Sequence, residues 1–346
     1  MAGPLDALEL DTPIIQAPMG GGFTTPELIA AVCDAGGLGS LGLTYSAPEA
    51  IAAAAEEMRR LTNRAFAINL FVFETPPIPP DSVKRTAERL APYCRELGIE
   101  PPDFSGPAHP SIPDQIEAVM AARPAVFSFT LGMPEPKVLA EFKRLGIVTV
   151  GTATTLAEGL ALEAAGVQAV CAQGAEAGGH RGTFIGPWQD GMVGTLPLTR
   201  MLAARLSVPV IAAGGIMDGA TAAGMLRVGA AAVQMGTAFL ACPESGVPAA
   251  HTRALLGADA AHTAVTSAFS GKPARGIVGR YMREMEAEAP ELAPFPVLNL
   301  MTRGLRAAAA KQDRGEFMSL WAGQAAPLSR AMPVAELMAT LKAEMA

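Results

Sequence analysis

Short, continuously apolar runs alternate with amphipathic segments along most of the chain. The runs are rich in Val, Ile and Ala, and eight of them cover residues 13–19, 38–42, 66–72, 125–132, 147–153, 169–173, 208–215 and 231–239. Such runs are typical of strands buried on both faces of a parallel sheet. Segments with helical spacing of apolar residues lie between them, and the first helix is expected to begin at Pro26 with Thr25 as its N-cap. The pattern therefore predicts an α/β protein built from repeated βα units.

Eight parallel βα units close naturally into a (β/α)₈ TIM barrel, and a doubly wound open sheet is the alternative. Residues 73–113 are rich in proline around one helical piece near 81–97, so we expect an excursion after the third strand that lies over the barrel mouth. Residues 242–299 are polar and off-pattern, and we expect a small helical cap there. The barrel itself would consist of residues 1–241 and 300–346.

Composition and charge argue against several classes of binding partner. The 346-residue chain has a net charge of −7 and no cluster of Lys and Arg, which argues against nucleic acid. The apolar stretch 228–242 is interrupted by glycine and glutamine and is too short to span a bilayer, and no secretory signal is evident. The four cysteines lack the spacing of a metal site. We therefore expect a cytoplasmic monomer or homodimer that acts on a small molecule, without a metal or a membrane.

The carboxyl ends of the predicted strands carry a glycine-rich, almost uncharged set of residues. In a barrel these ends form the active site. Backbone N–H groups at glycines can hold a phosphate, and amide side chains can bond the edges of a heterocycle. The set comprises residues 17–22, Asn69, Gly132, Gly151, Thr152, residues 173–180, Gly214, Gly215 and residues 234–237. It indicates a flat, phosphate-bearing cofactor, although the sequence contains neither a P-loop nor a Rossmann fingerprint.

Two of these strand ends are the most informative. The stretch 173–182 (QGAEAGGHRG) contains His180, one of only four histidines. Its glycines suit a loop that approaches a ligand, and equally a simple turn in which His180 is a hydrogen-bonded loop residue. The stretches 211–216 (IAAGGI) and 234–238 (QMGTA) follow the seventh and eighth predicted strands, where barrels bind phosphate. Tight packing of the strand ends is the alternative explanation for their glycines.

Six segments, in order over nearly the whole chain, resemble the nitronate monooxygenase family, formerly called 2-nitropropane dioxygenases. They are PIIQAPMGGG at 13–22, AINLF at 67–71, AQGAEAGGHRG at 172–182, AAGGI at 212–216, QMGTAF at 234–239 and SGKPARG at 270–276. The EAGGHRG form is typical of the class I branch. The resemblance implies an FMN-containing barrel without a metal that oxidises alkyl nitronates, such as propionate 3-nitronate, with O₂ to a carbonyl compound and nitrite.

The same resemblance implies roles for individual residues. His180 matches the family's active-site histidine, which would remove the α-proton of a neutral nitroalkane or, when protonated, stabilise the charge of a nitronate. Ala17, Pro18 and Met19 would line one face of the FMN ring, and Asn69 and Gln173 would contact the ring or the ribityl chain. Near the C-terminus, Trp321 would also approach the flavin. The residues expected to hold the ribityl chain and the phosphate are Gly178, Gly179, Gly214, Gly215, Gln234, Met235, Gly236 and Thr237.

Some features leave the function open. Several class I members carry tyrosines near 294–303, where this chain has Phe295, Leu298 and Leu300, so its substrate preference is undecided. Lys272 and Arg275 are either anion contacts or members of surface salt bridges.

Three other functions remain as alternatives. A flavin-dependent enoyl-acyl-carrier-protein reductase shares the barrel and an EAGGH motif but takes electrons from NADH. A barrel like inosine-monophosphate dehydrogenase shares the phosphate site but needs a nucleophilic cysteine in a glycine-rich strand-end loop, where none of the four cysteines lies. A flavin-binding module without turnover is the third.

Overall fold

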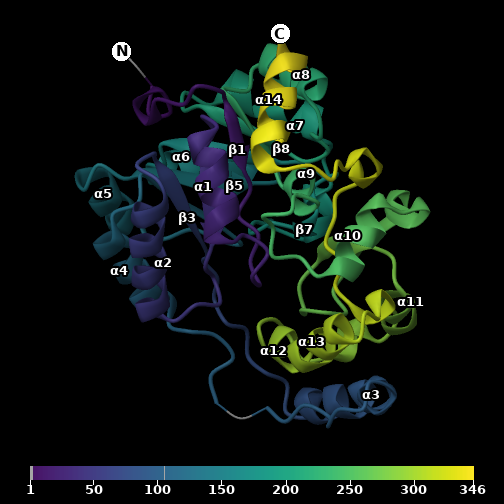
Figure 1. Cartoon of the computed structure of the whole chain (residues 1–346). Coiled ribbons are helices and arrows are strands. Elements are labelled where there is room, and N and C mark those ends of the chain that lie inside the picture. The colour runs from purple at the N-terminus through teal and green to yellow at the C-terminus, as the bar shows by residue number, and fades with distance from the viewer. Residues whose placement is uncertain (1–2, 105) are drawn as a thin grey trace.

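Residues 3–104 and 106–346, which a computed structural model describes, fold around a sheet of eight parallel strands. The strands are β1 (Ile14–Gln16), β2 (Gly39–Gly42), β3 (Phe66–Phe71), β4 (Val126–Thr130), β5 (Val148–Ala153), β6 (Ala169–Gln173), β8 (Val210–Ala213) and β9 (Ala232–Met235). They pair in the order β1-β9-β8-β6-β5-β4-β3-β2, and a parallel bridge between Ile15 and Leu38 joins the two edges. The predicted (β/α)₈ barrel is therefore confirmed over the open-sheet alternative (Figure 1).

Helices cover the outside of the barrel (Figure 1). They are α1 (Pro26–Asp34), α2 (Pro48–Leu61), α4 (Ile112–Ala122), α5 (Pro136–Arg144), α6 (Leu156–Ala165), α7 (Thr195–Arg205), α8 (Gly219–Val228) and α14 (Val334–Met345). α1 begins as predicted, because the Leu28 N–H donates to the Thr25 hydroxyl at 3.0 Å. β9 is followed only by the short α9 (Thr237–Leu240), and the outer position beside α8 and α1 is filled by α14. Among the described residues, no helix is long and apolar enough to cross a bilayer.

Apolar side chains on both sides of the sheet hold the barrel together. One cluster lies between the sheet and the outer helices, where Phe127 of β4 stacks on Phe142 of α5 with ring centroids 4.4 Å apart. Another lies inside the barrel near the amino ends of the strands and includes Ile15, Val148 and Leu8, the last from η1 (Asp6–Leu8). The interior is thus filled at the amino end, and the hollow that concerns function lies at the carboxyl end.

A second layer covers the carboxyl ends of the strands. Here α3 (Ser82–Glu96), from the proline-rich excursion, packs against α12 (Val297–Met301). These two helices share one apolar cluster with α10 (Ala249–Leu256), α11 (Arg280–Met285) and α13 (Arg303–Lys311). Figure 1 shows α3, α12 and α13 gathered on one side of the barrel. The helical layer agrees with the expected excursion and cap.

The cap also contains a small sheet that the sequence analysis missed. β10 (Thr263–Thr266) and β11 (Ala274–Ile277) form an antiparallel pair, and β11 pairs in turn with β7 (Gly179–His180) from the loop after β6. β7 is only two residues long, and its partner is distant in the sequence, so no local pattern marks it. The division of the chain at residues 242–299 stays a prediction, and α13 shares its apolar cluster with the cap helices.

The docking of α14 on α8 depends on Gly219. A Cβ at this position would lie 2.3 Å from the Leu341 carbonyl oxygen and 2.5 Å from Glu344 Cβ. We expect Gly219→Ala to lower the free energy of unfolding by about 1–3 kcal/mol, measured by urea denaturation. In the control Gly224→Ala, on the same helix, a Cβ meets no atom within 4 Å, and we expect no change or a gain of up to about 1 kcal/mol. Equal effects of the two substitutions would contradict the proposed contact.

Candidate active site

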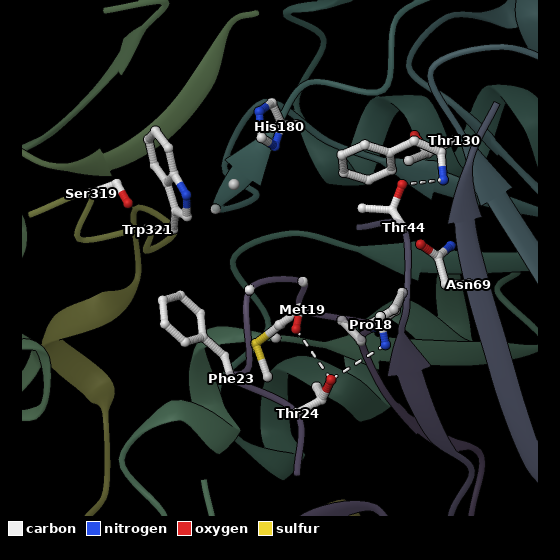
Figure 2. A pocket seen from close by; sticks show the side chains of 18 of the residues that line it. Pro18, Met19, Phe23, Thr24, Thr44, Asn69, Thr130, His180, Ser319 and Trp321 are labelled. Atoms are coloured by element: carbon white, nitrogen blue, oxygen red, sulfur yellow. Dashed lines mark hydrogen bonds between the residues drawn. The ribbon is translucent and has the colours of Figure 1, made fainter. Parts of the chain in front are cut away.

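A cavity of about 990 Å³ lies between the carboxyl ends of the strands and the cap (Figure 2). The expected site residues that line it are Ala17, Pro18, Met19, Asn69, Gln173, Gly178, Gly179, His180, Gly214, Gly215, Gln234, Gly236, Thr237 and Trp321. Met235 does not line it, because its side chain is 1% exposed and packs with Ile14 and Leu28 in the cluster beneath α1. Successive side chains of a strand face opposite ways, so Gln234 faces the cavity and Met235 the helices.

The loop between β6 and β7 is held by two buried guanidinium groups. Arg181 donates to the carbonyl oxygens of Gly174 and Gln173, at 2.6 and 3.0 Å. Arg275, from β11, donates from Nε to the Ala175 carbonyl oxygen at 3.0 Å. Arg275 is 4% exposed and is not among the residues that line the cavity. It therefore braces this loop, instead of contacting an anion or forming a surface salt bridge.

Glu176 and Gly178 fix the second half of the same loop. The Glu176 carboxylate accepts hydrogen bonds from the Thr195 N–H and hydroxyl, at 2.8 and 2.7 Å. A Cβ on Gly178 would lie 2.6 Å from the backbone N of Gly323, so only glycine allows the C-terminal segment to pass this close. That segment brings Trp321 to the cavity.

His180 lies in an aromatic setting. Its Nε2 is 2.9 Å from Ser270 Oγ, and the same hydroxyl bonds the backbone C=O and N–H of Lys272 at 3.0 and 3.2 Å. All three hydrogen bonds are satisfied when Ser270 donates to the Lys272 carbonyl and His180 Nε2–H donates to Ser270, which leaves the lone pair on Nδ1. The rings around it, with centroids at 5.4–5.9 Å, are Phe71, Phe295 and Trp321.

Burial keeps the His180 ring neutral. It lowers the pKa of His180 to about 3, and the positive charges of Lys272 and Arg306 act in the same direction. A neutral imidazole can accept a proton but gives an anion little electrostatic support. These surroundings therefore disfavour a free imidazolium, and a proton taken from a nitroalkane would be stabilised on the ring by the nitronate anion that the same step forms.

The ends of β8 and β9 form a glycine-rich part of the cavity wall. Gly214 and Gly215 have φ angles of 120° and 69°, which turn the chain sharply after β8. Thr237 Oγ1 accepts the Gly323 N–H at 3.0 Å, so its own hydroxyl hydrogen remains for a ligand. Glycine N–H groups and a hydroxyl at two neighbouring strand ends suit a phosphate.

Two amides expected to contact the flavin differ in their freedom to do so. Gln173 Nε2 donates to the His180 carbonyl at 2.9 Å, and its Oε1 accepts the Gly182 N–H at 2.8 Å. Asn69 Nδ2 donates to Ser128 Oγ at 2.9 Å, and its side chain points into the hollow (Figure 2). Gln173 is thus engaged in shaping the loop, whereas Asn69 has an oxygen to offer a ligand.

Sequence reasoning missed most of the cap-side wall. Ser270 lies in one of the motif segments, but nothing in the motif indicates that its hydroxyl reaches His180. Arg306 lies on α13, where an arginine in an amphipathic helix is normally solvated. Other lining residues without a sequence signal are Phe23, Thr24, Thr44, Tyr45, His109, Ser128, Thr130, Asn299 and Ser319; several of them surround the hollow in Figure 2.

The protonation state of His180 is open to direct measurement. We expect the ¹³C and ¹⁵N shifts of its ring, assigned by comparison with His180→Asn, to show the neutral form down to about pH 4.5. Between the ordinary pKa of 6.5 and the folded value of about 3, the unfolded state binds more protons. The free energy of unfolding should therefore fall as the pH drops through this window, and His180→Asn should remove that part of the pH dependence. Protonation near pH 6.5 would contradict the buried neutral ring.

Comparison with known proteins identifies the family. A family model described as nitronate monooxygenase matches residues 4–344. Nitronate monooxygenases of Paraburkholderia phytofirmans and Pseudomonas aeruginosa are 42% and 44% identical, covering 99% and 98% of this chain and 94% and 97% of their own. A crystal structure of nitroalkane oxidase from Streptomyces ansochromogenes has a TM-score of 0.92 at 40% identity, covering 99% of this chain and 98% of its own. The chain therefore belongs to the nitronate monooxygenase family.

Proposed function

We propose that this protein uses FMN to oxidise alkyl nitronates with O₂ to a carbonyl compound and nitrite, with propionate 3-nitronate as an expected substrate. The observation that carries the proposal is the position of His180. Its ring lies among aromatic rings, in the same cavity as the glycine-rich ends of β8 and β9, and burial lowers its pKa. Family membership supports a nitronate as the substrate class.

The residues of the cavity fit FMN. Gly215, Gly236 and Thr237 would hold the phosphate through backbone N–H groups and a hydroxyl. A Cβ on Gly236 would lie 3.5 Å from Ala17 Cβ, so the absent side chain keeps space free between two lining residues. Asn69 would bond the edge of the ring system through its Oδ1. A cavity of about 990 Å³ has room for such a cofactor together with a small substrate.

The chemical roles of FMN and of His180 follow from these assignments. Bound FMN supplies the electron acceptor, which no amino-acid side chain provides, between the nitronate and O₂. With a neutral nitroalkane, His180 accepts the α-proton, and the C–H bonding electrons move into the nitro group to form the nitronate. With a preformed nitronate no proton has to leave, and His180 positions the substrate. The rings of Phe71, Phe295 and Trp321 exclude water from the reacting carbon.

Replacement of His180 tests its role. We expect His180→Asn to retain FMN and to release nitrite from propionate 3-nitronate, but to lose nitroethane turnover by about 10²–10⁴-fold, because an amide cannot accept the α-proton. Nitrite release from each substrate and the visible spectrum are the measurements. An equal loss on both substrates would contradict the base role. A wild-type protein that is colourless and takes up no added FMN would contradict the proposed function.

Anaerobic mixing separates this function from the alternative of an enoyl-acyl-carrier-protein reductase. Bleaching of the flavin by propionate 3-nitronate, and not by NADH, is the expected result. Rapid bleaching by NADH alone would support the reductase. A flavin that neither compound bleaches would indicate a binding module.

The substitution Gly236→Ala tests the proposed phosphate site at Gly215, Gly236 and Thr237. The new methyl group makes ordinary contacts with the protein but occupies space beside Ala17 that a ligand would use. We expect FMN to bind about 5- to 100-fold more weakly, corresponding to about 1–3 kcal/mol, in a flavin-fluorescence titration. Gly224→Ala, on α8, should bind FMN like the wild type. Unchanged affinity in Gly236→Ala would remove this glycine from the cofactor site.

A further inference from the structure

A continuous run of aromatic rings leads from the cavity to α3, which lies at the outer edge of the molecule in Figure 1. Trp321 lines the cavity, and its ring centroid is 5.6 Å from that of Phe269. Phe269 is 4.6 Å from Tyr281 of α11, which is 5.1 Å from Tyr93 of α3. These four residues are called the aromatic run. Successive rings lie at the separations of packed aromatic pairs, across which an electron passes readily.

The aromatic run contains most of the side chains that are easily oxidised. The chain has only two tryptophans and three tyrosines, and one tryptophan and two tyrosines belong to the run. Indole and phenol lose one electron far more readily than a phenyl ring, so Phe269 bridges oxidisable neighbours. Apolar packing alone does not require this choice, because phenylalanine would fill the same space without placing a hydroxyl group in a buried cluster.

The two tyrosines differ in the partner of their hydroxyl group. Tyr281 is fully buried, and its hydroxyl donates to the Ala268 carbonyl oxygen at 3.1 Å. Tyr93 is 8% exposed and donates to Glu284 Oε2 at 3.0 Å. Oxidation makes a phenol strongly acidic, and a carboxylate can take its proton whereas a backbone carbonyl cannot. An oxidation that begins at Trp321 would therefore pass through Tyr281 and end at Tyr93.

Both phenols are protonated before any oxidation. Burial raises the pKa of Tyr93 to about 12, and the hydrogen bond to Glu284 acts in the same direction. Burial also raises the pKa of Tyr281. Each tyrosine therefore has a proton to lose, and Glu284, with a side chain 42% exposed, can pass it on to water.

The cavity contains side chains that oxidants damage. Met19 and Met318 line it together with Trp321. Oxidation turns a methionine thioether into a polar sulfoxide, which disrupts an apolar surface. A protein that brings a flavin and O₂ together exposes these side chains to one-electron oxidants. An electron supplied from the protein surface would remove such an oxidant before the cavity is altered.

We propose that the aromatic run is an electron path through which a reductant at the surface of the cap reduces one-electron oxidants in the cavity. The proposal rests on the FMN of the proposed function, and not on the nitronate. The oxidant is an O₂-derived radical or, under illumination, the light-excited flavin.

The steps of this path balance in electrons and protons. Trp321 gives one electron to the oxidant, and Tyr281 then reduces the oxidised Trp321. Tyr93 reduces the oxidised Tyr281 and loses its phenolic proton to Glu284. A surface reductant such as ascorbate returns one electron to Tyr93, and the Glu284 carboxyl group returns the proton. One electron has then moved from ascorbate to the oxidant, and the aromatic run is restored.

Blue light tests the path in the FMN-loaded protein without substrate or O₂. We expect illuminated, frozen wild-type protein to show a tyrosyl radical by EPR spectroscopy, and ascorbate to accelerate bleaching of the flavin. Tyr93→Phe and Tyr281→Phe each remove one hydroxyl group and keep the ring. Both should retain FMN but lose the tyrosyl signal and most of the ascorbate-dependent bleaching. Trp188→Phe, which replaces the tryptophan outside the run, should behave as the wild type.

Illumination in air tests the protective role. Peptide mass spectrometry should show that Met19, Met318 and Trp321 become oxidised faster in Tyr281→Phe than in the wild type, with ascorbate present in both samples. Equal rates of oxidation would overturn the protective role.

The outcomes separate this inference from the proposed function. A tyrosyl signal that survives in Tyr93→Phe, or that vanishes in Tyr45→Phe, would place the radical outside the aromatic run and overturn the inference. Nitrite release from a nitronate without any tyrosyl signal would reject the electron path alone. A tyrosyl signal that depends on Tyr93 and Tyr281, in a protein that releases no nitrite, would reject the proposed function alone. A protein that binds no FMN would reject both.

Discussion

The site depends on the hydrogen bonds that the Arg181 guanidinium donates to the backbone of the loop after β6. Backbone carbonyls buried beyond the end of β6 need hydrogen-bond donors, and one planar guanidinium provides several at fixed spacing. Arg275 adds another from β11. With the carbonyls satisfied, Gly178 and Gly179 can follow a path closed to other residues, and His180 reaches the cavity on β7.

Two halves of the structure contribute different parts of the site. The barrel provides the strand ends whose glycines suit a phosphate and a flat ring, as in other barrels. The cap and the C-terminal segment provide the opposite wall, on which Arg303 and Arg306 are lining cations and Trp321 is an aromatic surface. Both halves lower the pKa of His180, since burial between the barrel loop and the cap desolvates the ring and the positive charges of Lys272 and Arg306 disfavour its protonated form.

Local patterns predicted much of this architecture. α1 begins at Pro26 with Thr25 as its N-cap, as predicted, because a helix cap is encoded by neighbouring residues. Glycine-rich motifs likewise located the barrel side of the cavity, but the motif QMGTA did not reveal that Met235 faces the helices. β7 and the contact between His180 and Ser270 depend on pairing between residues about 90 or more positions apart, and no short-range pattern encodes such pairing.

The antiparallel ladder between β7 and β11 also limits how the enzyme can admit its substrate. A cap that swung away as a rigid lid would pull on Ala274 and break the backbone bonds that hold His180, so opening and an intact catalytic loop would exclude one another. A substrate that enters without breaking this ladder must pass between other residues that line the cavity, which include Tyr45 and His109. The pairing of β7 with β11 therefore ties the position of His180 to that of the cap.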